Sequence, residues 1–218
     1  MKGRFDSHIF WGSHSPLSML SGAALIILAS GRLAFALICA GALLWVFGLT
    51  ALIFSGAKKI LPVRGKMLVL LFISAFTCGI FMLLVSMLNP LLVLGTGFFL
   101  VLIPPCLLGS GLFEASEKVD LEEVFSRAFL EAMVLALLII AFSLIREPLG
   151  TGTLSFPGGA QGIVELFGAS GDDAFVPLRI LSSSAGGLLL LGYAAALFRF
   201  FRSRNHGLPD DHLEGGAS

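Results

Sequence analysis

Six stretches of the chain are almost entirely hydrophobic, and short polar stretches separate them. They cover residues 16–30, 33–56, 67–88, 91–113, 129–145 and 180–201. A helix that crosses a bilayer needs about 20 mostly apolar residues, so the pattern predicts an all-α membrane protein with six transmembrane helices. The first stretch is short, and Pro104-Pro105 interrupts the fourth, because proline removes a backbone donor and breaks the helical hydrogen-bond ladder.

Six helices divide into two sets of three, and an odd number of crossings leaves the second set inverted relative to the first. Inverted repeats place their functional site near the bilayer midplane, and short or broken helices at corresponding positions mark it. Helices one and four fit this description. We therefore expect two inverted three-helix repeats in a transmembrane domain at 16–201, between a cytoplasmic segment at 1–15 and a cytoplasmic tail at 202–218.

The positions of lysine and arginine predict the orientation of these helices. With a cytoplasmic N-terminus, only Arg32, Arg146 and Arg179 of the 14 basic residues fall in outer loops, as the positive-inside rule requires. The same orientation places the C-terminus in the cytoplasm. A second interpretation takes residues 1–30 as a cleaved signal peptide, which would leave five spans.

Composition narrows the class of protein further. Charged residues make up 13% of the chain and hydrophobic residues 56%, against about 25% charged residues in soluble domains. The 14 basic residues are balanced by 14 acidic ones, which leaves no basic surface for nucleic acid. Together these numbers exclude a soluble enzyme and a nucleic-acid binder.

Few side chains in the predicted spans offer chemistry. Cys39 and Cys78 are expected to be small apolar fillers. Cys106 directly follows the Pro104-Pro105 break, where a thiol is either a filler or a metal ligand. Glu131 is the only carboxylate predicted near a span interior, so the spans lack the buried acids typical of ion pathways. No nucleophile–base pair is present in the pattern, and no catalytic residue is predicted.

Two further patterns concern packing and loops. The long loop at 146–179 is rich in glycine and proline, and its middle, residues 160–167, predicts a short surface helix. Small residues four apart allow close helix packing; they occur at Ala36/Ala40, Ser182/Gly186 and Ser183/Gly187.

Two motifs resemble a known family. Residues 145–154 read IREPLGTGTL and resemble the Arg-Glu-x-x-Gly-x-Gly-Thr-Leu signature of the small six-helix subunits of the Rnf and Na⁺-translocating NADH:quinone reductase (Nqr) complexes. Residues 102–116 resemble the family's cysteine-containing run, and Ser15-Pro16-Leu17 resembles the start of its first helix. The predicted orientation matches the E-type subunit of Rnf (D-type of Nqr), whose A-type sister is inverted in the membrane.

The resemblance implies a cofactor. In this family two sister subunits hold a [2Fe-2S] cluster between them with four thiolates, one from each half of each subunit. It implies that Cys106 is the second-half ligand. Ala24 stands where the first-half cysteine is expected, and Pro105 stands where the family typically has asparagine. Ser21 is then the nearest replacement ligand; a cluster with three cysteines and an exogenous ligand, and a subunit without metal, are the other possibilities.

The resemblance also implies a function. It predicts a membrane subunit of an ion-translocating electron transport complex in a bacterial inner membrane, which helps to relay electrons across the membrane coupled to Na⁺ or H⁺ movement. Its partners would be an inverted sister subunit and other Rnf/Nqr-like subunits, with substrate oxidation on the latter. Two alternatives stay open: a cofactor-free assembly scaffold, and the substrate-binding membrane component of a small-solute importer with a pocket under the 146–179 loop.

Overall fold

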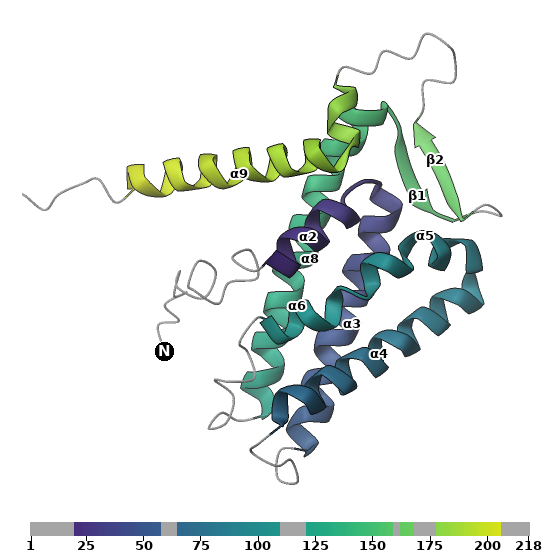
Figure 1. Ribbon diagram of the computed structural model, residues 1–218, viewed down its shortest axis with the longest axis vertical. Helices are drawn as coiled ribbons and strands as arrows, with labels where there is room; N and C mark the ends of the chain where they lie inside the picture. The colour runs from purple at the N-terminus through teal and green to yellow at the C-terminus, as the bar shows by residue number, and fades with distance from the viewer. Residues whose placement is uncertain (1–19, 58–64, 110–120, 159–161, 168–177, 206–218) are drawn as a thin grey trace, which may run out of the picture.

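The computed structural model describes residues 20–57, 65–109, 121–158, 162–167 and 178–205. They form a helical bundle with a β-hairpin at its upper end in Figure 1. The predicted N-terminal segment and residues 206–218 of the predicted tail lie outside the described residues. The elements in chain order are α2 (Leu20–Ala29), α3 (Leu33–Ala57), α4 (Lys66–Leu88), α5 (Pro90–Leu100), α6 (Ile103–Gly109), α8 (Leu121–Thr151), β1 (Leu154–Pro157), β2 (Ile163–Phe167), η2 (Arg179–Ser182) and α9 (Ser184–Asn205).

Four helical segments of the described chain are long and apolar enough to cross a membrane. They are α3, α4, the combined α5–α6 segment and residues 124–151 of α8. Each presents apolar side chains around much of its circumference, which only lipid or another protein can cover. The prediction of a mostly helical protein with several helices able to span a membrane is therefore confirmed. The chain is not all-α, because β1 and β2 form a hairpin, and the six-helix inverted repeat stays a prediction.

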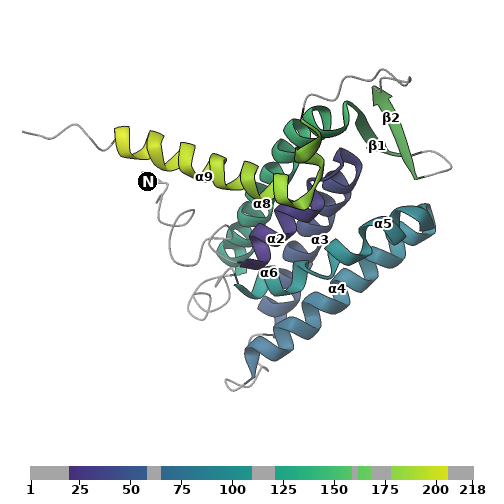
Figure 2. The ribbon, with the colours of Figure 1, turned by 45° about the horizontal axis from the view of Figure 1, so that its top comes forward.

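The first and last helices differ from these four. The described part of α2 has 10 residues, which gives a length of about 15 Å, half of the hydrocarbon thickness. The apolar part of α9 ends at Leu197 and is also shorter than a span. In both ribbon views α9 leads away from the bundle, and it packs against α2 and η2 (Figures 1 and 2).

The core of the protein lies between α3 and α8, which make the most extensive contact of any two elements. Ala36 and Ala40 on α3 are buried, which confirms that these small residues pack inside the bundle. Larger buried side chains of the two helices belong to one hydrophobic cluster, among them Leu43, Val46, Phe47, Leu135 and Ile139. At the upper end of the bundle, α2 and β1 pack against both of these helices, and η2 packs against α8.

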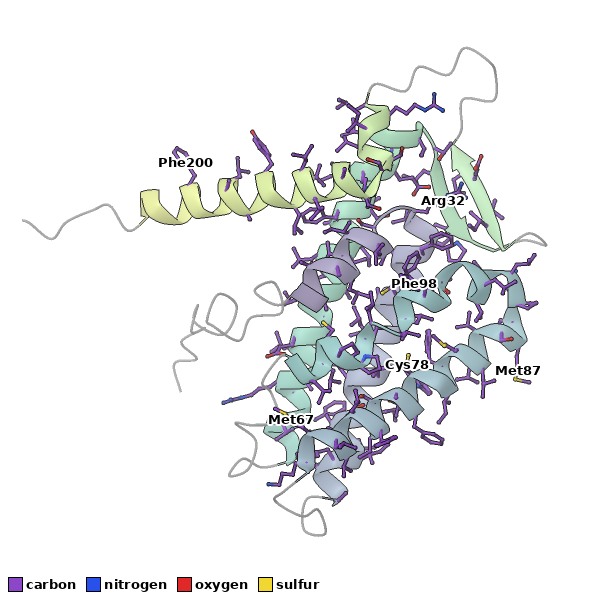
Figure 3. All side chains as sticks on the ribbon, viewed as in Figure 1. Arg32, Met67, Cys78, Met87, Phe98 and Phe200 are labelled. Carbon is purple, nitrogen blue, oxygen red and sulfur yellow. The ribbon has the colours of Figure 1, made fainter. Side chains whose placement is uncertain are left out.

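The helix α4 buries only one narrow stripe. Its buried residues are Leu70, Ser74, Thr77 and Cys78, a spacing of three to four that follows one helix face. The hydroxyls of Thr50 on α3 and Thr77 lie 3.4 Å apart. Phe81 and Met82 are partly buried against the core, and much of the remaining surface of α4 is exposed, as Figure 3 shows for Met87 at its far end.

Two predictions for the second half are wrong in detail. Residues 163–167 form a strand that pairs antiparallel with β1, not a surface helix. The β-branched pair Ile163-Val164 favours the extended backbone, and the partner strand supplies its hydrogen bonds. The helix α8 is longer than the predicted span at 129–145 and runs to Thr151, so Arg146 is part of a helix and not of a loop.

Candidate functional site

The predicted helix break is present, but it lies just before the two prolines, which are themselves part of α6. A turn at residues 101 and 102 separates α5 from α6. In a continuous helix the amide of residue 104 would donate to the carbonyl of Leu100, and Pro104 has no such donor. The thiol of Cys78 on α4 donates to this carbonyl at 3.3 Å instead. Cys78 therefore has a specific role at the break, which sequence reasoning had assigned to Cys106 alone.

Cys106 lies in the first turns of α6 and is 2% exposed. It belongs to the same buried cluster as Cys39 and Cys78. A cluster held between two sister subunits needs its sulfur ligands at the surface that the sisters share. The thiol of Cys106 lies within this chain's own core, and Ala24 offers no ligand atom.

Nothing else in the described ranges completes a cluster site. No group of three or more His, Cys, Asp or Glu side chains there is placed to hold a metal ion. The side chain of Ser21 lies outside the described residues. As arranged, the described residues do not form a [2Fe-2S] ligand set, and Cys106 as a ligand stays a prediction.

The motif that carries the family resemblance forms a much more specific structure. Arg146 is 3% exposed, and its guanidinium donates to two separate chain segments. One nitrogen, Nη1, donates to the carbonyl of Ile27 and to Ser30 Oγ, the latter at 3.1 Å. These acceptors lie at the C-terminal end of α2, where unpaired carbonyls carry partial negative charge.

The other two guanidinium nitrogens bind the segment that precedes α9. Nε donates to the carbonyl of Leu181 at 2.7 Å. Nη2 donates to the carbonyls of Ser182 and Ser183 at 3.3 and 2.9 Å. Only a planar group with five donors can reach so many carbonyls at once. Arg146 thus ties α2, α8 and the start of α9 together.

The neighbouring residue Glu147 binds the next helix. It is 1% exposed, and its Oε2 accepts the backbone N–H of Leu33 at 2.6 Å. Leu33 is the first residue of α3, where free N–H groups and the helix dipole favour a negative charge. One helical turn therefore places a cation at the end of α2 and an anion at the start of α3. We call Arg146, Glu147 and the backbone groups that they bind the Arg–Glu clasp.

The position of Glu147 differs from the one that the sequence predicts. Glu131 was expected to be the only carboxylate near a span interior, yet Glu147 is buried within α8. The pattern of the sequence placed residue 147 in a loop because two charges and a proline follow Ile145. The motif itself was the available signal, since an adjacent Arg-Glu pair at the end of an apolar stretch can cap two helix ends.

Close packing around the clasp depends on glycine. A Cβ atom on Gly187 would lie 3.1 Å from the Arg146 guanidinium carbon, and one on Gly186 would lie 2.2 Å from the carbonyl oxygen of Ile180. A Cβ atom on Gly150 would lie 2.8 Å from the backbone nitrogen of Ser182. The prediction of close helix packing at residues 186 and 187 is confirmed.

The hairpin extends the clasp across the same end of the bundle. Ser155 on β1 is buried and accepts the N–H of Ala34 at 3.3 Å, which satisfies a second donor at the start of α3. Gly162, which leads into β2, approaches Asn89 and Leu92 at the turn between α4 and α5. Residues 146–158 and Gly162 thereby connect the second half of the chain to the α2–α3 turn and to the α4–α5 turn.

This arrangement binds backbone groups at the end of α2, at the start of α3 and before α9. Comparison of the chain with models of known families and with curated proteins gives no match. Membership of the Rnf/Nqr family therefore stays a prediction that rests on the motifs quoted above.

Proposed function

We propose that this chain is a membrane subunit of an Rnf/Nqr-like electron transport complex, in which it positions the path of electrons between carriers on the two sides of a bacterial inner membrane. The observation that carries the proposal is the Arg–Glu clasp. The residues that resemble the family signature are the ones that join the α2–α3 turn to α8 and to the start of α9.

The arrangement of the helices supports the inverted-repeat part of the proposal. Each half begins with a short or broken helical segment: α2 in the first half, and α5–α6 in the second. Each continues with a long helix, and these two, α3 and α8, pack against each other in the centre. In the proposed six-span protein α9 completes the second half and both termini are cytoplasmic.

The burial of Cys106 bears on what kind of subunit this is. With one buried thiol at the break and Ala24 at the other expected position, the described residues favour a subunit that holds the scaffold of the complex. The electron relay itself would then depend on ligands from the inverted sister subunit. The importer alternative would need a solute pocket beneath the hairpin, where the described side chains instead pack against α3 and the α4–α5 turn.

Purification of the tagged full-length chain from its native membrane tests the proposal. We expect it to bring down a second six-helix membrane protein together with flavin and iron–sulfur subunits. Recovery of an ATPase subunit in place of redox subunits would overturn the proposal in favour of the importer. Recovery of the chain without any partner would also refute it.

The cofactor question needs a separate measurement on the same complex. The EPR spectrum of the reduced complex is recorded for the wild type, Cys106→Ser and Cys39→Ser; Cys39 is an equally buried core thiol and serves as the matched control. Loss of a [2Fe-2S] signal in Cys106→Ser alone identifies Cys106 as a ligand. A signal unchanged in both variants removes Cys106 from that role and leaves the scaffold function.

A further inference from the structure

Near its upper end, within residues 143–147, the helix α8 carries two buried side-chain oxygen atoms that have no hydrogen-bond partner among the described residues: Ser143 Oγ and Glu147 Oε1. Ser143 is fully buried and Glu147 is 1% exposed. Residues four apart in a helix lie one turn apart on the same face, so both oxygens belong to the same face of α8. Buried polar atoms are nearly always paired, and each exception needs a physical explanation.

The surroundings of Glu147 supply a hydrogen-bond donor to only one of its two carboxylate oxygens. Its Oε2 accepts the N–H of Leu33 at the first turn of α3, where the helix dipole stabilises an anion. The guanidinium of the adjacent Arg146 adds a positive charge in the same region. An ionised carboxylate can accept about four hydrogen bonds, and Oε1 accepts none from the described residues. The second oxygen therefore needs a donor.

The chemistry of the region identifies that donor. A metal cation is disfavoured, because the N-terminus of α3 and Arg146 already supply positive charge, and hard cations take six or more oxygen ligands. An apolar group would leave both oxygens unpaired. A water molecule donates to a carboxylate and also bonds a hydroxyl, and buried waters typically join polar groups in this way.

We propose that Ser143 and Glu147 hold an internal water molecule between α8 and the first turn of α3. The water donates one hydrogen to Glu147 Oε1 and shares a second hydrogen bond with Ser143 Oγ. It completes the hydrogen bonding of the Arg–Glu clasp inside the helical bundle. This inference does not depend on the proposed function, since it concerns only the packing of α8 against α3.

A density map of the full-length protein in lipid nanodiscs, at a resolution that shows ordered water, tests the proposal. We expect a peak within about 3.2 Å of both oxygens. A Ser143 hydroxyl bonded directly to Glu147 would overturn it. So would a peak with the short contacts and many oxygen ligands of a cation, or a protein side chain from outside the described ranges.

A matched pair of variants adds a second test. Ser143→Val fills the space with methyl groups that cannot bond water, so the peak is expected to disappear. Ser74→Val makes the same change at an equally buried serine on α4, whose hydroxyl donates to the carbonyl of Leu71, and the peak is expected to stay. A peak that persists in Ser143→Val contradicts the proposal. Should that variant fail to fold, the wild-type map decides alone.

Discussion

Replacement of Arg146 by alanine should destabilise the upper end of the bundle strongly. The variant removes a guanidinium that donates to Ile27, Ser30 and three backbone carbonyls of the segment before α9. It leaves the bonded groups in place without their donor. Of the two charged side chains that bind the α2–α3 turn, only Glu147 then remains.

The magnitude follows from which acceptors can find another donor. The carbonyls of Ser182 and Ser183 belong to exposed residues, and water or lipid headgroups can replace Arg146 there. The acceptors at Ile27 and Ser30 belong to buried residues. Ser30 Oγ also donates to the Ile27 carbonyl, but at 3.4 Å, so this long bond replaces only part of the lost donation, and a buried group left short of a partner costs about 1–3 kcal/mol. Loss of packing by the arginine side chain adds to this. We expect a total loss of about 3–5 kcal/mol, the range for removing one member of a buried charged network.

Thermal unfolding of the purified chain in detergent measures this loss. For a protein of this size about 1 kcal/mol corresponds to 2–4 °C in Tm, so Arg146→Ala should lower Tm by about 10 °C. Arg179→Ala is the matched control, because Arg179 is an exposed arginine three residues before Ser182, and its Tm should stay within about 2 °C of the wild type. Arg146→Lys should be intermediate, since one ammonium cannot reach both segments.

An Arg146→Ala variant as stable as Arg179→Ala would refute this reasoning. It would mean that the carbonyls at the end of α2 are satisfied by other groups and that the clasp contributes little. The site at which a protease first cuts the Arg146→Ala variant is a further check. Proteolysis should cut the Arg146→Ala variant first near the α2–α3 turn, because that turn loses its anchor.

Two further predictions concern single contacts in the bundle. Gly186→Ala should prevent correct folding, because the new Cβ would lie 2.2 Å from a backbone oxygen. Gly192→Ala on the same helix is the control: its Cβ meets nothing within 4 Å, so the change should be neutral or slightly stabilising. Size-exclusion chromatography compares the two variants, and equal yields of monodisperse protein would contradict the expectation. Cys78→Ala should lower the free energy of unfolding by about 1 kcal/mol, because the Leu100 carbonyl loses its donor. Cys78→Ser keeps a donor and should recover most of this stability. Equal Tm values for the two variants would show that the hydrogen bond from the thiol is unimportant.

Several features of the fold follow from the sequence because they depend on neighbouring residues. Long apolar stretches predict α3 and α4 to within a few residues, since a bilayer selects them by length and hydropathy alone. The Pro104-Pro105 pair predicts the helix break, because a missing backbone donor acts locally. The strand at 163–167 was mistaken for a helix, because a short apolar segment takes its backbone conformation from the partner strand.

The clasp could not be predicted in this way. Whether Arg146 ends a helix in solvent or lies buried depends on acceptors at Ile27 and Ser30, which are 119 and 116 residues away in sequence. The hydrogen bond of Cys78 could not be predicted either, because its acceptor, the carbonyl of Leu100, belongs to another helix.

The sequence by itself therefore determined the class of this protein: apolar helices that need a bilayer, a fixed break, and small residues where helices approach. Only the tertiary structure decided which polar groups are buried and what they bind. The physical reason is that hydropathy is a sum over adjacent residues, whereas a buried charge is tolerated only where distant parts of the chain bring it hydrogen-bond partners.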